Sequence, residues 1–387
     1  MKPARRLESL PIYVFASLTS RLKALQAQGL DIIRLDIGSP DGPPADFIIE
    51  TLSRSAAEPG QHGYAGYFGT PALRQAFVDY YATRFGVALN VADEVLPLIG
   101  SKEGIANIAL AWLDPGDLAL APDPGYPTYR MSATMAGADV HFMPLLEENG
   151  FLPDLAAIPD DVAARVRLMW LNYPNNPTGA TAPLSFLEAA VDFCRQHDIL
   201  LCHDGPYADV CFDGYRAPSL LSVPGAKDVA VEFNSLSKSH NMAGWRVGLA
   251  VGNPVAIQAL LQVKSNVDSG IFLPVQDAAV AALAGQQEWL ATRNAEYQSR
   301  RDLLYDLLVN DWGLHVARPI AGLYLWPRVP EGYTAAEFVE RILLATGVSF
   351  TPGSAFGAHG EGYMRISVGQ TTPRIVEAIE RLRQFKF

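Results

Sequence analysis

Apolar, β-branched runs that end in small polar loops alternate with helical periodicity from about residue 32 to 275. The runs lie at 32–37, 95–99, 118–121, 166–171, 199–203, 229–233 and 247–251. Such alternation predicts an α/β fold with a doubly wound, mostly parallel sheet. In folds of this kind, ligands bind where loops leave the carboxyl ends of the strands. The loops are therefore the first place to look for chemistry.

The pattern changes in the C-terminal part of the chain. Short strands at 323–326 and 364–368 alternate there with helices at 334–346 and 373–385, the last of which Thr372 is expected to cap. We therefore expect a large domain over residues 32–282, and a smaller α/β domain built from residues 1–31 and 283–387. Further helices are expected at 13–28, 183–197, 254–264, 275–285 and 287–310.

The stretch 229–248, VAVEFNSLSKSHNMAGWRVG, places Lys238 among serines at the end of a buried strand. Desolvation and the nearby guanidinium of Arg246 both oppose the ammonium form, so this lysine can act as a nucleophile. The hydroxyls of Ser235 and Ser237, with Arg246, suit a phosphate dianion. Together these groups suggest pyridoxal phosphate (PLP) held by Lys238 as a Schiff base. The alternative is a loop lysine beside a structural arginine.

The motif S-x-S-K, followed eight residues later by W-R-x-G, resembles the PLP-lysine signature of the class I/II aminotransferases. The segments LPxYxFA and IGxPD at the start of the chain resemble the opening of LL-diaminopimelate and alanine aminotransferases, and NPTG at 176–179 also matches the family. The resemblance implies the fold-type I architecture of PLP-dependent transferases. It also implies a homodimer with both active sites at the subunit interface.

Loops at the ends of three predicted strands carry candidate cofactor-binding residues. The loop GSKEG at 100–104 joins a strand to a helix and forms an anion cradle, and the resemblance assigns Ser101 and Lys102 to the cofactor phosphate. Tyr126, in a proline-rich loop, has an aromatic face that suits a pyridine ring, although packing is the alternative. Asn176 can donate a hydrogen bond to the phenolate oxygen of the cofactor.

Asp204 stands at the end of the strand 199–203, with Tyr207 three residues later. A carboxylate there can pair with the protonated pyridine nitrogen and keep the ring an electron sink. Tyr207 can donate to the phenolate and lower the pKa of the Schiff base. The family commonly has D-x-A-Y where this chain has D-G-P-Y, so Pro206 is a departure next to two retained positions. We expect Lys238, Asp204 and Tyr207 to be the catalytic residues.

Other residues are assigned to the substrate or to a partner subunit by the resemblance. Arg365 lies inside an apolar strand and needs an anion; the family assigns it to the substrate α-carboxylate, and an internal salt bridge is the alternative. The resemblance also implies that a tyrosine reaches the phosphate of the neighbouring subunit; by position this is Tyr64, with Tyr67 as the competitor. The substrate-binding residues implied are Tyr13, Gly38, Lys102, Tyr126, Asn176 and Arg365.

Composition excludes several other classes of function. The net charge is −11 and no basic cluster occurs, which argues against nucleic acid and anionic membranes as partners. No apolar run reaches transmembrane length, and the first residues lack a signal-peptide cleavage site. The odd number of cysteines, Cys194, Cys202 and Cys211, predicts reduced thiols in a cytoplasmic protein. Seven scattered histidines predict no metal site.

These residues predict a PLP-dependent aminotransferase. It would move an amino group between an L-amino acid, with an LL-diaminopimelate-like or alanine-like donor, and a 2-oxo acid such as 2-oxoglutarate or pyruvate. A PLP-dependent lyase or decarboxylase is the alternative, because the cofactor permits any bond to Cα to break. A PLP-sensing regulator would carry a DNA-binding domain ahead of this fold. Because the fold is expected to start near residue 30, the sequence argues against that class. The complete residue set argues against a mere binding protein. No residue stands out as a reader of the distal end of the substrate.

Overall fold

The computed structural model describes residues 2, 7–8, 10, 14–285 and 288–387. Its strands are β1 (Ile33–Arg34), β2 (Val95–Leu98), β3 (Leu118–Asp123), β4 (Asp139–Pro144), β5 (Val166–Leu171), β6 (Leu200–Asp204), β7 (Ala230–Ser235), β8 (Gly248–Gly252), β9 (Tyr324–Leu325), β10 (Val348–Ser349), β11 (Thr351–Pro352) and β12 (Met364–Ser367). Its α-helices are α1 (Val14–Ala27), α2 (Asp46–Ala56), α3 (Pro71–Phe85), α4 (Ser101–Trp112), α5 (Thr128–Ala136), α6 (Asp160–Ala163), α7 (Leu184–His197), α8 (Leu236–Ser239), α9 (Pro254–Lys264), α10 (Leu273–Ala284), α11 (Glu288–Asp306), α12 (Ala335–Thr346) and α13 (Thr372–Arg383).

The main sheet has seven strands in the order β2-β8-β7-β6-β5-β3-β4. All neighbouring pairs from β7 to β4 are parallel, whereas β8 runs antiparallel to both β7 and β2. Helices cover both faces: α3, α7 and α10 contribute to one apolar cluster, and α4, α5 and α9 to another. The central strands are buried along their whole length, as expected for a sheet covered on both sides. The predicted doubly wound, mostly parallel sheet is confirmed.

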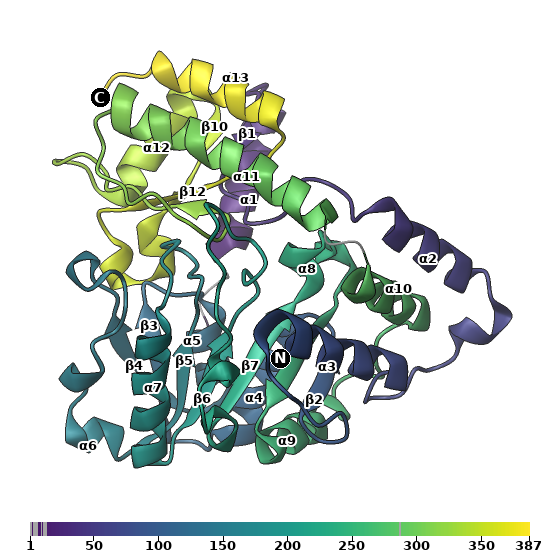
Figure 1. Ribbon diagram of the computed structural model, residues 1–387. Helices are drawn as coiled ribbons and strands as arrows, with labels where there is room; N and C mark the ends of the chain where they lie inside the picture. The colour runs from purple at the N-terminus through teal and green to yellow at the C-terminus, as the bar shows by residue number, and fades with distance from the viewer. Residues whose placement is uncertain (1, 3–6, 9, 11–13, 286–287) are drawn as a thin grey trace.

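A second, smaller unit lies above the main sheet in Figure 1 and contains α1, β1 and most of the C-terminal segment. Strand β1 pairs in parallel with β10, and β12 lies between β11 and β9 in an antiparallel sheet. A separate apolar cluster joins residues of β1, α11, α12, β12 and α13. The domain boundaries at 31/32 and 282/283 stay a prediction, and the pairing of β1 places its residues beside the C-terminal segment. None of the helices in the described part of the chain combines the length and apolar character needed to cross a bilayer.

The first strand and the start of the last helix both differ from the expectation. The strand expected at 32–37 is limited to Ile33–Arg34, because a bend at Asp36 interrupts the extended backbone. Helix α13 begins at Thr372 and is preceded by Thr371 as its N-cap, so the expected cap at Thr372 is wrong. The hydroxyl of Thr372 instead accepts a hydrogen bond from Nε of Arg300 at 3.0 Å.

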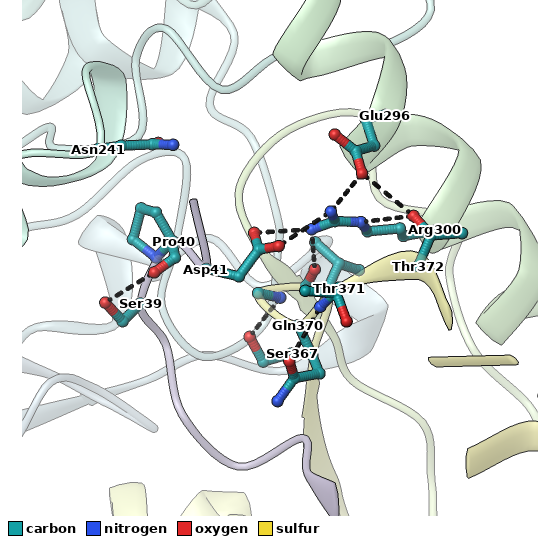
Figure 2. Close-up of polar contacts among 12 residues, drawn as sticks. Ser39, Pro40, Asp41, Asn241, Glu296, Arg300, Ser367, Gln370, Thr371 and Thr372 are labelled. Atoms are coloured by element: carbon teal, nitrogen blue, oxygen red, sulfur yellow. Dashed lines mark hydrogen bonds and ion pairs between the residues drawn. The ribbon is translucent and has the colours of Figure 1, made fainter. Parts of the chain in front are cut away.

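That arginine ties the glycine- and proline-rich loop after β1 to the C-terminal helices (Figure 2). Arg300 on α11 is buried, and its Nη1 and Nη2 atoms donate to the two carboxylate oxygens of Asp41 at 2.8 and 3.0 Å. Glu296, one helical turn earlier, accepts a further hydrogen bond from the same guanidinium. The network fixes the loop that carries Gly38, and Gly38 lines the cavity described next.

Candidate active site

A cavity of about 510 Å³ lies at the carboxyl ends of the parallel strands, between the main sheet and the smaller unit. Its volume is within the range of small-molecule sites. Most of the residues predicted to bind cofactor or substrate line it. They are Gly38, Ser101, Lys102, Tyr126, Asn176, Asp204, Tyr207, Ser235, Ser237, Lys238, Arg246 and Arg365. The structure therefore brings together residues that span most of the sequence.

Two predicted residues are not among those lining the cavity. Tyr64 lies in a loop before α3 with its side chain 92% exposed, and Tyr67 is also exposed. In a single chain neither tyrosine reaches the cavity. Tyr13 lies outside the described residues.

Lys238 lies on α8, the single helical turn that follows β7. Ser235 begins this turn, because its side chain accepts from the backbone N–H of Ser237. The Nζ atom of Lys238 donates to the carbonyl oxygen of Gly38. Burial, followed by the positive charges of Arg365 and Arg246, lowers the pKa of Lys238 to about 8, while Asp204 opposes this shift. With this pKa, about one tenth of the amine is unprotonated at pH 7 and about half at pH 8, and the unprotonated form is the one that acts as a nucleophile or general base.

The anion cradle is formed where α4 begins, opposite the end of β7. Gly100 has a φ of 78°, and a Cβ there would lie 2.2 Å from Nη2 of Arg246, so only glycine lets the guanidinium approach. The hydroxyls of Ser235 and Ser237 lie 2.9 Å apart on the same wall. Ser101 is the first residue of α4 and lines the cavity. The free backbone N–H groups at the start of a helix favour an anion.

Asp204 ends β6 and is buried. Its Oδ2 atom accepts a hydrogen bond from the hydroxyl of Tyr129 at 2.8 Å, whereas Oδ1 has no hydrogen-bond partner among the described residues. Burial raises the pKa of Asp204 to about 6, although the Tyr129 hydrogen bond, His203 and Lys238 lower it. A buried carboxylate oxygen without a partner is costly, so Oδ1 is positioned for a donor that the protein alone does not supply.

The Asn-Pro loop after β5 is held by hydrogen bonds within the loop and to Asp204 and Arg365. Asn172 donates from Nδ2 to the backbone oxygen of Asp204 at 2.6 Å and accepts from the backbone N–H of Asn176 at 2.8 Å. The Oδ1 atom of Asn176 accepts from Nη1 of Arg365 at 2.7 Å, which leaves its amide group to donate into the cavity. Pro206, the departure from the family pattern, also lines the cavity, and Tyr207 still does so beside it.

Arg365 on β12 is 3% exposed and is held between three aromatic rings. Besides Asn176, it donates from Nη2 to the backbone oxygen of Asp36 at 2.8 Å. No carboxylate in the described part of the chain forms a salt bridge with it, so the internal salt bridge considered from the sequence is not found. A buried cation of this kind requires an anionic ligand, and a carboxylate matches the planar guanidinium.

Sequence reasoning did not single out Tyr129 and Tyr324. Tyr129 follows Tyr126 by three residues, and the turn that leads into α5, closed by a hydrogen bond from the N–H of Tyr129 to the oxygen of Tyr126 at 3.2 Å, brings the Tyr129 hydroxyl against Asp204. The hydroxyl of Tyr324 lies 2.7 Å from that of Tyr207, and its ring packs on Arg365. A Cβ on Gly38 would overlap the Tyr324 hydroxyl, which explains the glycine. A tyrosine within an otherwise apolar strand was the available signal for Tyr324.

Replacing Tyr129 with phenylalanine is expected to raise the pKa of Asp204 above about 6 in the protein without cofactor. The hydroxyl stabilises the charged carboxylate, and a hydrogen bond to a charged group contributes about 1.5 kcal/mol, or about one pH unit. Carbon-13 NMR of the aspartate carboxyl groups would measure the shift. Tyr173→Phe is the matched control, since that buried hydroxyl donates to the backbone oxygen of Phe151. An unchanged Asp204 pKa in the Tyr129 variant would show that the hydrogen bond is energetically unimportant.

The comparisons with known proteins cover nearly the whole chain. The family model described as aminotransferase class I and II matches residues 30–382. An LL-diaminopimelate aminotransferase of Moorella thermoacetica is 50% identical over 384 residues, which is 99% of this chain and 98% of the relative. An LL-diaminopimelate aminotransferase of Dehalococcoides mccartyi is 49% identical over 386 residues, covering 100% and 99% of the two chains.

Solved structures agree with the fold. Substrate-bound BacF from Bacillus subtilis superposes with a TM-score of 0.94 at 36% identity, covering 99% of this chain and 97% of that one. A probable N-succinyldiaminopimelate aminotransferase from Thermus thermophilus gives a TM-score of 0.90 at 36% identity, with coverages of 96% and 99%. A mutant aspartate aminotransferase of Thermus thermophilus gives 0.92 at 28% identity, with 99% of each chain covered.

Proposed function

Because this chain belongs to the class I and II aminotransferases, we propose that it transfers an amino group from LL-diaminopimelate to a 2-oxo acid such as 2-oxoglutarate or pyruvate. The family resemblance seen in the sequence is confirmed, and the enzyme is PLP-dependent like its family. The choice of donor rests on the names of the relatives that are about 50% identical over almost the full length. The acceptor is open between the two oxo acids.

The residues of the cavity fit PLP. The unpartnered Oδ1 of Asp204 suits the protonated ring nitrogen, and the cradle that Gly100 opens beside Arg246 suits the phosphate. We assign Ser101, Lys102, Ser235, Ser237 and Arg246 to the phosphate, in agreement with the anion-binding chemistry of hydroxyls, helix N-termini and guanidinium groups. Tyr126 would stack on the ring, and Asn176 and Tyr207 would donate to the phenolate oxygen.

When bound, the cofactor supplies an electron sink for the pair left behind as a bond to the substrate Cα breaks. Lys238 would hold the cofactor covalently and, once displaced by the substrate amine, take the α-proton on Nζ as general base. Its lowered pKa keeps part of the amine unprotonated for this role. Asp204, as a carboxylate, would hold the proton on the ring nitrogen, and the hydrogen bond from Tyr129 would orient that carboxylate.

The observation that carries the proposal is the buried, anion-deficient Arg365 in the same cavity as Lys238. An α-carboxylate bound by Arg365 would place the substrate amine and Cα on the side of the cavity where Lys238 lies. Asn176 and the aromatic rings fix the guanidinium in advance, so little ordering is needed when the substrate binds. Tyr13, Gly38, Lys102 and Tyr126 are the further substrate contacts that we propose.

We also propose a homodimer in which Tyr64 reaches the phosphate of the partner subunit. Tyr64 and the nearby apolar side chains Phe68, Val267 and Phe272 are exposed in the single chain. The loop that carries Tyr64 packs closely on a second loop. The approach is so close that a Cβ on Gly270 would lie 2.2 Å from the backbone oxygen of Gly66. A cytoplasmic location stays a prediction from cysteine usage, and the three cysteines are free thiols.

The function is tested by the absorbance of the purified, cofactor-loaded enzyme. L-amino acids would be added one at a time: LL-diaminopimelate, alanine, glutamate, aspartate and phenylalanine. We expect LL-diaminopimelate to convert the cofactor band to that of pyridoxamine phosphate with the highest kcat/KM, and an oxo acid to reverse the change. If only alanine converted the cofactor band, alanine would replace LL-diaminopimelate as the donor. Release of ammonia or carbon dioxide in place of a reversible band shift would favour a lyase or decarboxylase.

A further inference from the structure

The charged side chains that line the cavity are Arg34, Asp36, Lys102, Asp204, Lys238, Arg246 and Arg365. The proposed reaction gives each of the last five a part in binding the cofactor, binding the α-carboxylate or moving a proton. Arg34 and Asp36 have no such part. They carry opposite charges, and both come from the segment that starts at β1, on the side of the cavity formed by the smaller unit.

The two side chains form a bidentate ion pair that orients the guanidinium. Nε of Arg34 donates to Oδ1 of Asp36 and Nη2 donates to Oδ2, both at 2.6 Å. The side chain of Asp36 is 2% exposed, whereas that of Arg34 is 22% exposed. The Nη1 atom of Arg34 takes part in no hydrogen bond with the described residues. Both carboxylate oxygens of Asp36 therefore accept from Arg34, and Nη1 is the donor that the pair leaves available.

The pair lies next to the proposed α-carboxylate site, because the backbone oxygen of Asp36 accepts from Nη2 of Arg365. Arg34 lies two residues before Asp36, in strand β1, and its guanidinium is held on the Asp36 carboxylate. The cavity therefore presents two guanidinium groups to a dicarboxylic amino acid, that of Arg365 for the α-carboxylate and that of Arg34 for a second carboxylate.

A purely structural part for the pair explains less. Strand β1 is already fixed to β10 by backbone pairing, including the hydrogen bond from the N–H of Leu35 to the oxygen of Ser349 at 3.0 Å. A buried ion pair contributes little net stability, because desolvation offsets the attraction between its charges. Neither the attachment of β1 nor the stability of the ion pair explains why the Arg34 guanidinium faces a ligand cavity.

We propose that Arg34, oriented by Asp36, binds the distal carboxylate of the substrate and so selects a dicarboxylic amino acid over a monocarboxylic one. The inference rests on the proposed function and deepens it by naming the residue that reads the far end of the donor. Arg34 would then be a specificity-determining residue, and Asp36 a positioning residue. A guanidinium held in place by a carboxylate loses little freedom when it binds a second anion.

The test compares substrates that differ only at the distal end. LL-diaminopimelate and L-2-aminopimelate carry the distal carboxylate, and L-2-aminoheptanoate lacks it. For Arg34→Met we expect kcat/KM to fall about 10- to 100-fold with both dicarboxylic substrates, the effect of losing a charge-assisted hydrogen bond. With L-2-aminoheptanoate the change should stay within about threefold. Asp36→Asn keeps the side-chain shape and should lower the same selectivity ratio by a smaller factor.

Equal losses on dicarboxylic and monocarboxylic substrates would overturn the inference and leave a structural ion pair. Thermal unfolding and the cofactor absorbance of each variant report on folding, and Arg34→Gln, which removes the charge but keeps an amide that can donate to Asp36, replaces Arg34→Met if that variant does not fold. The proposed donor is tested separately. If the wild-type enzyme rejects LL-diaminopimelate but prefers L-2-aminopimelate to L-2-aminoheptanoate, the proposed donor is wrong, and the comparison of Arg34→Met with wild type on those two substrates still tests the part of Arg34. A wild-type enzyme without that preference overturns the inference whatever its donor.

Discussion

Replacing Lys238 with alanine is expected to lower transamination by at least about 10⁴-fold. The change removes a general base, which by itself contributes about 10²- to 10⁴-fold, together with the covalent attachment of the cofactor. Stopped-flow absorbance of the half-reaction with LL-diaminopimelate would measure the loss. The variant should still bind the cofactor, because the phosphate cradle and Asp204 do not depend on the lysine side chain.

Lys227→Ala is the matched control for that experiment. Lys227 donates to Glu94 at 3.0 Å, does not line the cavity and is partly exposed, so its loss should leave turnover within about twofold. Substantial turnover by Lys238→Ala without an added small amine would contradict the assigned role. Since the pKa of Lys238 is lowered to about 8 before the cofactor binds, covalent loading of the cofactor should accelerate as pH rises toward 8.

Asp204→Asn is expected to lower the rate of the half-reaction by about 10²- to 10³-fold, the usual effect of removing a preorganised charged group. An amide cannot hold the proton on the ring nitrogen as a carboxylate does. Asp204→Glu keeps the charge with a longer side chain and should retain more activity than the asparagine variant. If Asp204→Asn were as active as the wild-type enzyme, the unpartnered Oδ1 would have another purpose.

The Asp204→Asn substitution should also make the cofactor-free protein more stable than wild type at high pH. Folding raises the pKa of Asp204 from 3.8 to about 6, so the folded state holds this proton more tightly than the unfolded state. The resulting stabilisation is present below pH 3.8 and is lost as pH rises through about 6. Above that, the buried charge costs about 3 kcal/mol, from roughly two pH units at 1.36 kcal/mol each.

Urea unfolding of the cofactor-free protein at pH 5 and pH 8 would measure this effect. The stability of Asp204→Asn relative to wild type should be larger at pH 8 than at pH 5. A difference that is the same at both pH values would show that the charge is not the cause. A gain in stability with a loss of activity is typical of a site kept strained for function.

Much of the fold could be predicted from the sequence because its signals are local. The strand β5 and the helix α9 have the predicted bounds, and a capping box of Thr334 and Glu337 begins α12 in the helix predicted at 334–346. Hydrophobic periodicity and caps depend on neighbours within a few residues. Local signals define the ends of elements less well. One helix was expected over 287–310, but α11 ends at Asp306 and a π-helical turn, Leu307–Asp311, follows it.

The candidate site was predictable to the extent that the chemistry sits at strand ends. Asp204, Lys238 and Arg365 each stand out as a charge beside or within an apolar run, and each lines the cavity. Their catalytic roles stay predictions until the variants are measured. The contacts of Tyr129 and Tyr324 were missed because a tyrosine in an apolar segment has the same pattern whether it packs in the core or serves a site.

The sequence by itself determined the α/β class, the strands and the set of reactive side chains, because each is encoded by residues close together in the chain. Only the tertiary structure decided which of them meet. Asn176 contacts Arg365 from 189 residues away, and Tyr129 contacts Asp204 from 75 residues away. It also turned Arg34 and Asp36, two ordinary charges beside a short strand, into an oriented pair in the wall of the cavity. The physical reason is that these contacts depend on the strand order and on how the smaller unit packs on the sheet. Local hydrophobic periodicity determines neither of them.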